Sequence, residues 1–201
     1  MEIACLGWGS LVWDPKDLPI RSPWFSDGPF LPIEFARIAK DERVTLVLSP
    51  NARPVRIFFA LLSPTDLEEA KCKLAKRERF DDFAQKPNNR IGCILKKPDS
   101  GSIEIAPRKE IDRSVIEKIR LWLGVVGMDA VIWTNSKPKM SSADKIYRKP
   151  TLPEVIRHLH SLPDAQKKAA EEYIRKTPRQ IDTEYRRQIA SEFDWWPIGD
   201  V

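Results

Sequence analysis

The sequence predicts an α+β protein in which the strands precede most of the helices. Segments rich in β-branched and aromatic residues lie in the first two thirds of the 201-residue chain, and helix-start signals gather in the last third. A composition of 42% hydrophobic and 31% charged residues is typical of a globular protein with a sizeable core. The change of character after residue 134 predicts a domain over 1–134 and a helical C-terminal extension over 135–201 that packs on it.

The first predicted strand leads directly into a glycine-rich turn. Four apolar residues, 3–6, run into Gly7-Trp8-Gly9-Ser10, and apolar character resumes with Leu11-Val12-Trp13. Two glycines allow positive φ angles and a close approach of the backbone to a ligand. Successive N–H groups in such a turn favour an anion or a polarised carbonyl oxygen. The alternative is an ordinary turn that ends a strand.

The remaining strands are predicted from short apolar runs between turn residues. A loop rich in proline and aromatic residues, 14–27, precedes three of them, and a hairpin is expected further on across Asp99-Ser100-Gly101. The predicted strands are Phe30–Ala36, Val44–Ser49, Val55–Leu62, Ile91–Lys96, Ile103–Ala106 and Asp129–Thr134.

The helices are predicted from capping signals and from apolar residues at helical spacing. Ser63 as N-cap, with Pro64 at the first helical position, predicts a helix from Pro64 to Arg77. Ile181, Tyr185, Ile189 and Phe193 recur every four residues, so the last helix is expected to pack against the domain. The other predicted helices are 111–124 with a stop at Gly124, Thr151–His160 with Glu154 completing a capping box, Pro163–Arg175, and a last helix from Thr177 to Phe193.

Glu78 is the candidate catalytic residue. At about 100° per residue, Glu78 falls about 20° from Leu67, on the apolar face that also carries Leu74. A carboxylate on an apolar face at a helix end is partly desolvated, and desolvation makes it a better proton acceptor near neutral pH. The alternative is a frayed helix end at which Glu78 pairs with Arg77 or Arg79 at the surface.

Composition and charge narrow the classes of function. The net charge of +5 is mild and its basic residues are mixed with acidic ones, which disfavours a nucleic-acid partner. No run reaches the ~18 apolar residues of a membrane span, and three scattered cysteines without a CxxC motif are typical of a reduced, cytoplasmic protein. No metal-ligand spacing or cofactor motif occurs, so neither is expected. The oligomeric state is left open, a homodimer included.

Two of these motifs resemble the gamma-glutamylcyclotransferase superfamily, most of all its ChaC-type branch. Residues 6–13 resemble its glycine–aromatic–glycine–serine–leucine loop, and residues 74–78 its leucine-x-x-arginine-glutamate helix end. Residues 44–48 and 57–61 stand where that family has paired strands. The resemblance covers roughly residues 1–134 and implies a mixed β-barrel-like sheet with packed helices.

The resemblance also implies an activity and the residues for it. In such an enzyme the α-amine of a γ-glutamyl compound attacks its own γ-carbonyl, which releases 5-oxoproline and an amine without a metal or cofactor. Glu78 matches the catalytic glutamate, and the residues that match the substrate-binding loop are Gly7, Trp8, Gly9, Ser10 and Leu11. Trp8 stands where the family usually has tyrosine, and residues 79–83 lack the glycines usual in the ChaC-type branch.

The sequence leaves two further points open. The leaving amine can belong to a dipeptide, to glutathione or to another γ-glutamylated small molecule. The alternative to an enzyme is a non-catalytic small-molecule-binding or regulatory protein on the same fold, since proteins that share a fold can differ in function.

Overall fold

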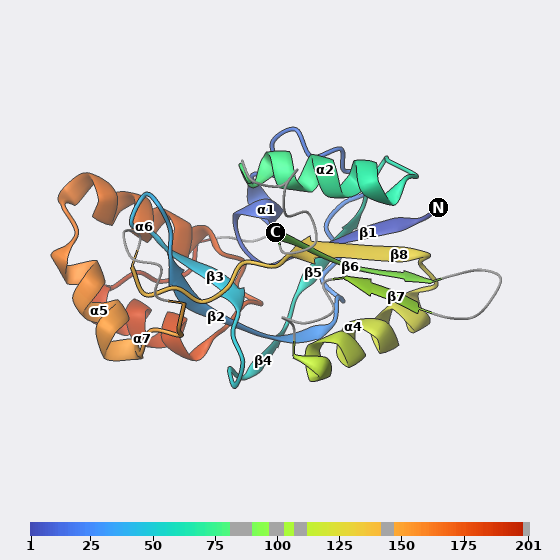
Figure 1. The fold of residues 1–201 in the computed structure, drawn as a ribbon. Coiled ribbons are helices and arrows are strands. Elements are labelled where there is room, and N and C mark those ends of the chain that lie inside the picture. Colours follow the sequence, from blue (N-terminus) through green and yellow to red (C-terminus); the bar gives the residue numbers. More distant parts are fainter. Residues whose placement is uncertain (81–89, 97–102, 107–111, 142–146, 199–201) are drawn as a thin grey trace. The chain divides into compact units, whose positions relative to one another are not determined.

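The computed structural model describes residues 1–80, 90–96, 103–106, 112–141 and 147–198 (Figure 1). These residues group into two compact units that interleave along the chain. Unit 1 comprises Met1–Gly7, Asp14–Phe30 and Arg56–Asn135, and unit 2 comprises Trp8–Trp13, Leu31–Val55 and Ser136–Val201. The chain therefore passes from one unit to the other after residue 135, and residues 31–55 group with the C-terminal residues.

Unit 1 is built on a five-stranded sheet with β1 and β8 next to each other near its centre. The order is β5-β1-β8-β6-β7, in which β1 is parallel to β8 and the other pairs are antiparallel. Every residue of β1 is buried, as expected for a strand covered on both faces. The strands are β1 (Ile3–Gly7), β5 (Phe58–Leu61), β6 (Ile91–Lys96), β7 (Ile103–Ala106) and β8 (Ala130–Thr134).

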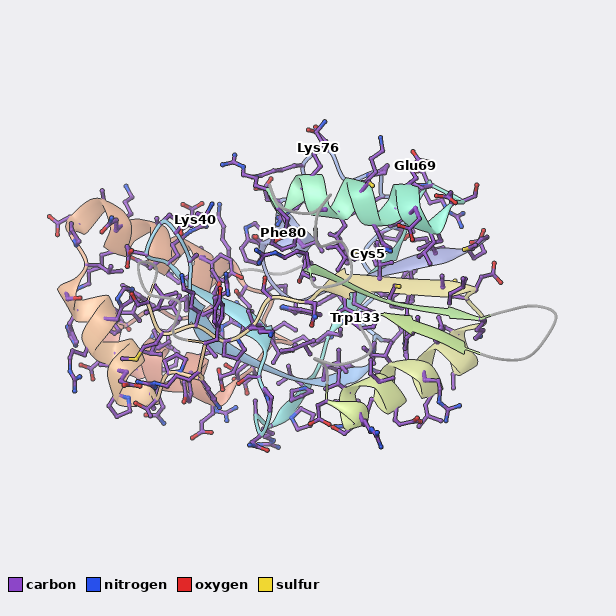
Figure 2. The ribbon with its side chains drawn as sticks, viewed as in Figure 1. Cys5, Lys40, Glu69, Lys76, Phe80 and Trp133 are labelled. Carbon is purple, nitrogen blue, oxygen red and sulfur yellow. The ribbon has the colours of Figure 1, made fainter. Side chains whose placement is uncertain are left out.

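Two helices cover the two faces of this sheet. Helices α2 (Leu67–Arg77) and α4 (Arg113–Val126) lie on opposite sides of it (Figure 1). Cys5 pairs with Ile132, so Trp133, one residue further, lies on the other face (Figure 2). Trp122 of α4 contacts the ring of Phe59 edge to face, at 4.9 Å between ring centroids.

The ends of both helices differ from the sequence prediction. Helix α2 begins at Leu67 and is capped by Asp66, whose carboxylate accepts a hydrogen bond from the N–H of Glu69. Ser63 is not the N-cap: its N–H donates instead to the carbonyl of Pro19. Helix α4 runs through Gly124 and ends before Gly127, whose left-handed φ of 73° gives a C-cap that glycine adopts without strain. The predicted start of α4 at Ile111 and the hairpin turn at 99–101 lie outside the described residues.

Unit 2 combines a three-stranded sheet, in which β2 and β3 are antiparallel, with the C-terminal helices. Its sheet has the order β3-β2-β4, and the short α1 follows the glycine turn. The capping contact of α5 is confirmed, since the Glu154 carboxylate accepts a hydrogen bond from the N–H of Thr151 at 2.8 Å. The elements are α1 (Ser10–Trp13), β2 (Phe30–Ile38), β3 (Val44–Leu48), β4 (Pro54–Arg56), α5 (Leu152–Ser161), α6 (Asp164–Lys176) and α7 (Glu184–Phe193).

Two predicted elements are divided or shortened in the structure. The single strand expected over 55–62 is two strands, β4 and β5, which belong to different sheets. The last helix begins at Glu184, because Thr183 is its N-cap and residues 177–181 form a connection. Carbonyl groups of that connection accept hydrogen bonds from the buried guanidinium of Arg186. Ile181, Tyr185 and Ile189 are buried, and Phe193 is half-buried.

The α+β class is confirmed. The described strands form two separate sheets, and no closed barrel occurs among them. None of the described helices combines the length and apolar character needed to cross a membrane.

A buried carboxylate, Glu34 on β2, ties α7 to the sheet of unit 2. It accepts hydrogen bonds from the hydroxyl of Thr183 and from the N–H groups of Phe35 and Tyr185. Burial raises the pKa of Glu34 above its usual value, while these hydrogen bonds and the charge of Lys149 oppose the rise.

Glu34 should therefore give the unfolding free energy a characteristic pH dependence. A raised pKa in the folded state means that stability is gained as Glu34 takes up its proton, and lost as the pH rises through the folded pKa. The unfolding free energy of the wild type minus that of Glu34→Gln should be larger at pH 5 than at pH 7. Urea denaturation of both proteins at the two pH values measures this difference. A difference between the two proteins that does not change with pH would contradict this expectation.

Candidate functional site

Glu78 lies at the C-terminal end of α2 and is largely buried. It is the C-cap residue, and its N–H donates to the carbonyl of Leu74 at 3.0 Å. Its side chain is 22% exposed, and Arg77 Nη1 donates to its Oε1 at 2.5 Å. Arg77 itself is only 7% exposed, so this ion pair is more enclosed than the surface pair considered from the sequence.

Arg77 also connects the end of α2 to the loop that follows the glycine turn. Its Nη2 donates to the carbonyl of Asp14 at 2.6 Å. A guanidinium that donates in two directions from one plane restricts its own rotamer and that of the carboxylate it binds. Arg77 therefore fixes Oε1 of Glu78.

The Glu78 carboxylate lies close to β1, the strand that ends at Gly7. Burial raises the pKa of the Cys5 thiol well above its ordinary value, the charge of Glu78 raises it further, and the charge of Arg77 lowers it. These influences place Glu78 and Arg77 within electrostatic reach of Cys5, on the face of the sheet that α2 covers. Burial and the raised pKa both favour the thiol of Cys5 over the thiolate that a nucleophilic cysteine needs.

The glycine turn in unit 2 is clamped onto the edge of β3. Trp8 Nε1 donates to the carbonyl of Leu46 at 3.3 Å, and the N–H of Leu46 donates to the hydroxyl of Tyr173 at 3.4 Å. Both outward-facing backbone groups of Leu46 are thus satisfied by side chains, and Trp8 is only 5% exposed. The indole of Trp8 is a structural group, and only the backbone of Trp8 is left for a ligand.

Gly9 is required for space and not for its φ angle. Positive φ occurs at Gly127 but at neither Gly7 nor Gly9, so this turn does not use the positive φ that its glycines allow. A Cβ atom on Gly9 would lie 2.4 Å from the hydroxyl oxygen of Tyr173. The edge of Trp13 also contacts the Tyr173 ring, at 5.4 Å between centroids. Tyr173 thus packs directly against the turn.

The predicted site residues are distributed over the two units. Gly7 and Glu78 belong to unit 1, and the other four loop residues, Trp8, Gly9, Ser10 and Leu11, belong to unit 2. Within unit 1 the structure places Glu78 near the strand that ends at Gly7. That Glu78 and the whole loop form one site remains a prediction.

Three residues with notable polar side chains in the structure were not found from the sequence. Tyr173 lies in the highly charged α6, and its local sequence pattern is the same as that of an aromatic residue that only fills the core. Trp133 and Asn135 carry buried donors without partners, at the end of β8. The signal available for Asn135 was that a polar residue directly follows a buried strand, where ligand-binding residues often stand.

No metal site is indicated in the part of the chain that the structure describes. It contains no group of three or more His, Cys, Asp or Glu side chains that could hold an ion. Comparisons with models of known protein families, with curated proteins and with solved structures gave no match.

Substitution of Gly9 tests the packing of Tyr173 against the turn. Gly9→Ala should lower the free energy of unfolding by ~1–3 kcal/mol, because the new methyl group overlaps the Tyr173 hydroxyl. Tyr173→Phe alone should cost about 1 kcal/mol for the lost hydrogen bond to Leu46. The double variant should lose less than the sum of the two in thermal or urea denaturation. Strict additivity would show that the two residues do not touch.

Proposed function

We propose that this protein is a gamma-glutamylcyclotransferase-like enzyme that releases 5-oxoproline from a γ-glutamyl peptide or amine. The observation that carries the proposal is the position of Glu78. Its carboxylate is held by Arg77 and lies within electrostatic reach of β1, whose last residue, Gly7, opens the glycine turn. Support also comes from the two motifs that resemble this superfamily.

Glu78 is the general base of the proposed reaction. Its Oε2 takes a proton from the substrate's α-ammonium group, and the resulting amine attacks the γ-carbonyl carbon. The new C–N bond closes a five-membered lactam, and the attacking nitrogen loses its second proton to solvent. The original C–N bond breaks, and Glu78 returns the first proton to the leaving amine. One carboxylate can perform both transfers.

Orientation supplies much of the rate in such an intramolecular reaction. Holding the amine near attack distance can contribute ~7–11 kcal/mol. The backbone N–H groups of the loop Gly7–Leu11 would hold the substrate carboxylate or the developing oxyanion, where one well-placed donor contributes ~3–4 kcal/mol. This role uses backbone atoms alone, so it is compatible with the hydrogen bond that the Trp8 indole donates to the carbonyl of Leu46.

A non-catalytic protein that binds a small molecule on the same fold is the second candidate. The observation that favours it is that Arg77 already occupies Oε1 of Glu78. In a binding protein this pair would act as a fixed polar clamp, with no proton transfer.

Replacement of Glu78 separates the two candidates. In the enzyme, Glu78→Gln should lower kcat by ~10²–10⁴-fold, because the amide cannot accept the proton. Formation of 5-oxoproline from a panel of γ-glutamyl compounds measures the effect. Glu69→Gln is the matched control, since Glu69 is an exposed acid on the same helix and pairs only weakly with Lys73, at 3.9 Å (Figure 2). It should leave kcat unchanged.

Two outcomes would overturn the enzyme hypothesis. One is a Glu78→Gln protein that is as active as the wild type on a compound the wild type cyclises. The other is a folded wild-type protein that forms no 5-oxoproline from any compound of the panel, in which case Glu78→Gln should change only ligand affinity.

A further inference from the structure

Thr134, the last residue of β8, carries a hydroxyl group at the border between core and surface. The four residues of β8 before it are buried, whereas Thr134 is only half-buried. Within the part of the chain that the structure describes, no hydrogen bond engages this hydroxyl. A hydroxyl group can both donate and accept, so Thr134 can bond to a ligand without breaking a contact of the fold.

Strand alternation places Thr134 on the face of the sheet that α2 covers. Cys5 of β1 pairs with Ile132 of β8 in the parallel ladder, so their side chains point to the same face. Thr134 is two residues further along β8 and therefore points the same way. The charge of Glu78 acts on the thiol of Cys5, so the Glu78 carboxylate lies on this face as well. The hydroxyl and the carboxylate share one side of the sheet.

A series of contacts brings the end of α2 to the end of β8. Phe80 follows Glu78 by two residues, and the guanidinium of Arg90 lies over the Phe80 ring, 5.4 Å from its centroid. The carbonyl of Arg90 in turn accepts a hydrogen bond from the N–H of Asn135, the residue after Thr134, at 2.8 Å. Helix α2 also runs in the same direction as β1, so its C-terminal end lies towards the carboxyl ends of β1 and β8 (Figure 1).

The register of the parallel strands sets Thr134 beside the start of the glycine turn. Cys5 pairs with Ile132, and the same register continued by two residues brings Thr134 next to Gly7. Both residues stand at the carboxyl ends of their strands, where ligands of sheets with parallel strands bind. Thr134 therefore lies where the proposed substrate loop begins.

The charges at this edge suit a ligand that carries both signs. Glu78 and the C-terminal end of α2, which is the negative end of the helix dipole, favour a positive group. The positive charge of Arg90 and the hydroxyl of Thr134 favour a negative group with acceptor oxygens. The α-carbon of a γ-glutamyl compound carries an ammonium group and a carboxylate group, so this one carbon presents both partners.

We propose that Thr134 binds the α-carboxylate of the γ-glutamyl substrate through a hydrogen bond that its Oγ1 donates. The inference rests on the proposed function for the identity of the substrate. The α-amine then meets Glu78, and the carboxylate on the same carbon meets Thr134. Thr134 holds this end of the substrate and takes no part in proton transfer.

Binding of the reaction product tests the role of Thr134 without requiring turnover. The probe is 5-oxoproline, which keeps the carboxylate, and 2-pyrrolidinone, the same lactam ring without the carboxylate, is its control. Thr134→Val keeps the β-branched shape and removes the hydroxyl. In chemical-shift titrations of ¹⁵N-labelled protein, this variant should bind 5-oxoproline with a Kd at least ~10-fold above that of the wild type. Its affinity for 2-pyrrolidinone should be unchanged.

Three further variants separate the hydroxyl from the shape of the side chain. Thr134→Ser keeps the hydroxyl, so its Kd for 5-oxoproline should stay within ~3-fold of the wild-type value. Thr134→Ala lacks the hydroxyl and should bind as weakly as Thr134→Val. Thr65→Val is the matched control, because Thr65 is exposed and precedes α2, at the helix end away from Glu78. It should leave the Kd unchanged, and thermal denaturation reports whether each variant is folded.

The outcomes distinguish the role of Thr134 from the proposed catalysis. Wild-type affinity for 5-oxoproline in a folded Thr134→Val or Thr134→Ala protein overturns this role, even if the wild type cyclises γ-glutamyl compounds. An equal loss for 2-pyrrolidinone, or a wild type that does not bind 5-oxoproline, overturns it as well. A loss that is specific to 5-oxoproline, in a protein that never forms this compound, upholds the carboxylate contact and overturns the catalysis.

Discussion

The pairing of β1 with β8 is the interaction on which the organisation of unit 1 depends. It joins residues 3–5 to residues 130–132 in parallel, and the N–H groups of Asp129 and Ala130 both donate to the carbonyl of Glu2 at its start. Because the two strands are parallel, their carboxyl ends meet at one edge of the sheet. That edge carries Gly7 and Asn135, and α2 brings Glu78 towards it from one face.

In unit 2, polar side chains complete backbone hydrogen bonding where secondary structure stops. Trp8 and Tyr173 occupy the two outward-facing groups of Leu46 on an edge strand, and the glycine turn is held there as a consequence. Arg186 binds four carbonyl groups at the end of α6 and in the connection after it, and burial lowers its pKa to about 10. Since a buried charge is costly unless its hydrogen bonds are satisfied, these contacts restrict the path between α6 and α7.

Elements with strong local signals were predicted well. The strands β2 and β3, the pairing of β6 with β7 and the capping contact between Thr151 and Glu154 all follow from neighbouring residues. The errors occur where a distant contact overrides the local preference. Ser63 is a good N-cap by type, yet its N–H is bonded to Pro19, and the apolar run over 55–62 is divided because its two halves pair in different sheets.

The sequence by itself determined that Glu78 shares the apolar face of its helix, because helical periodicity fixes which residues lie on one side. It also determined that a glycine turn follows the first buried strand. Only the tertiary structure decided that Arg77 fixes one oxygen of Glu78, that Gly9 is needed to make room for Tyr173, and that the donors of Trp133 and Asn135 stand unpaired together. Gly9 and Tyr173 lie far apart in the chain, and the burial of the other two pairs depends on how sheets and helices pack, which no local pattern encodes.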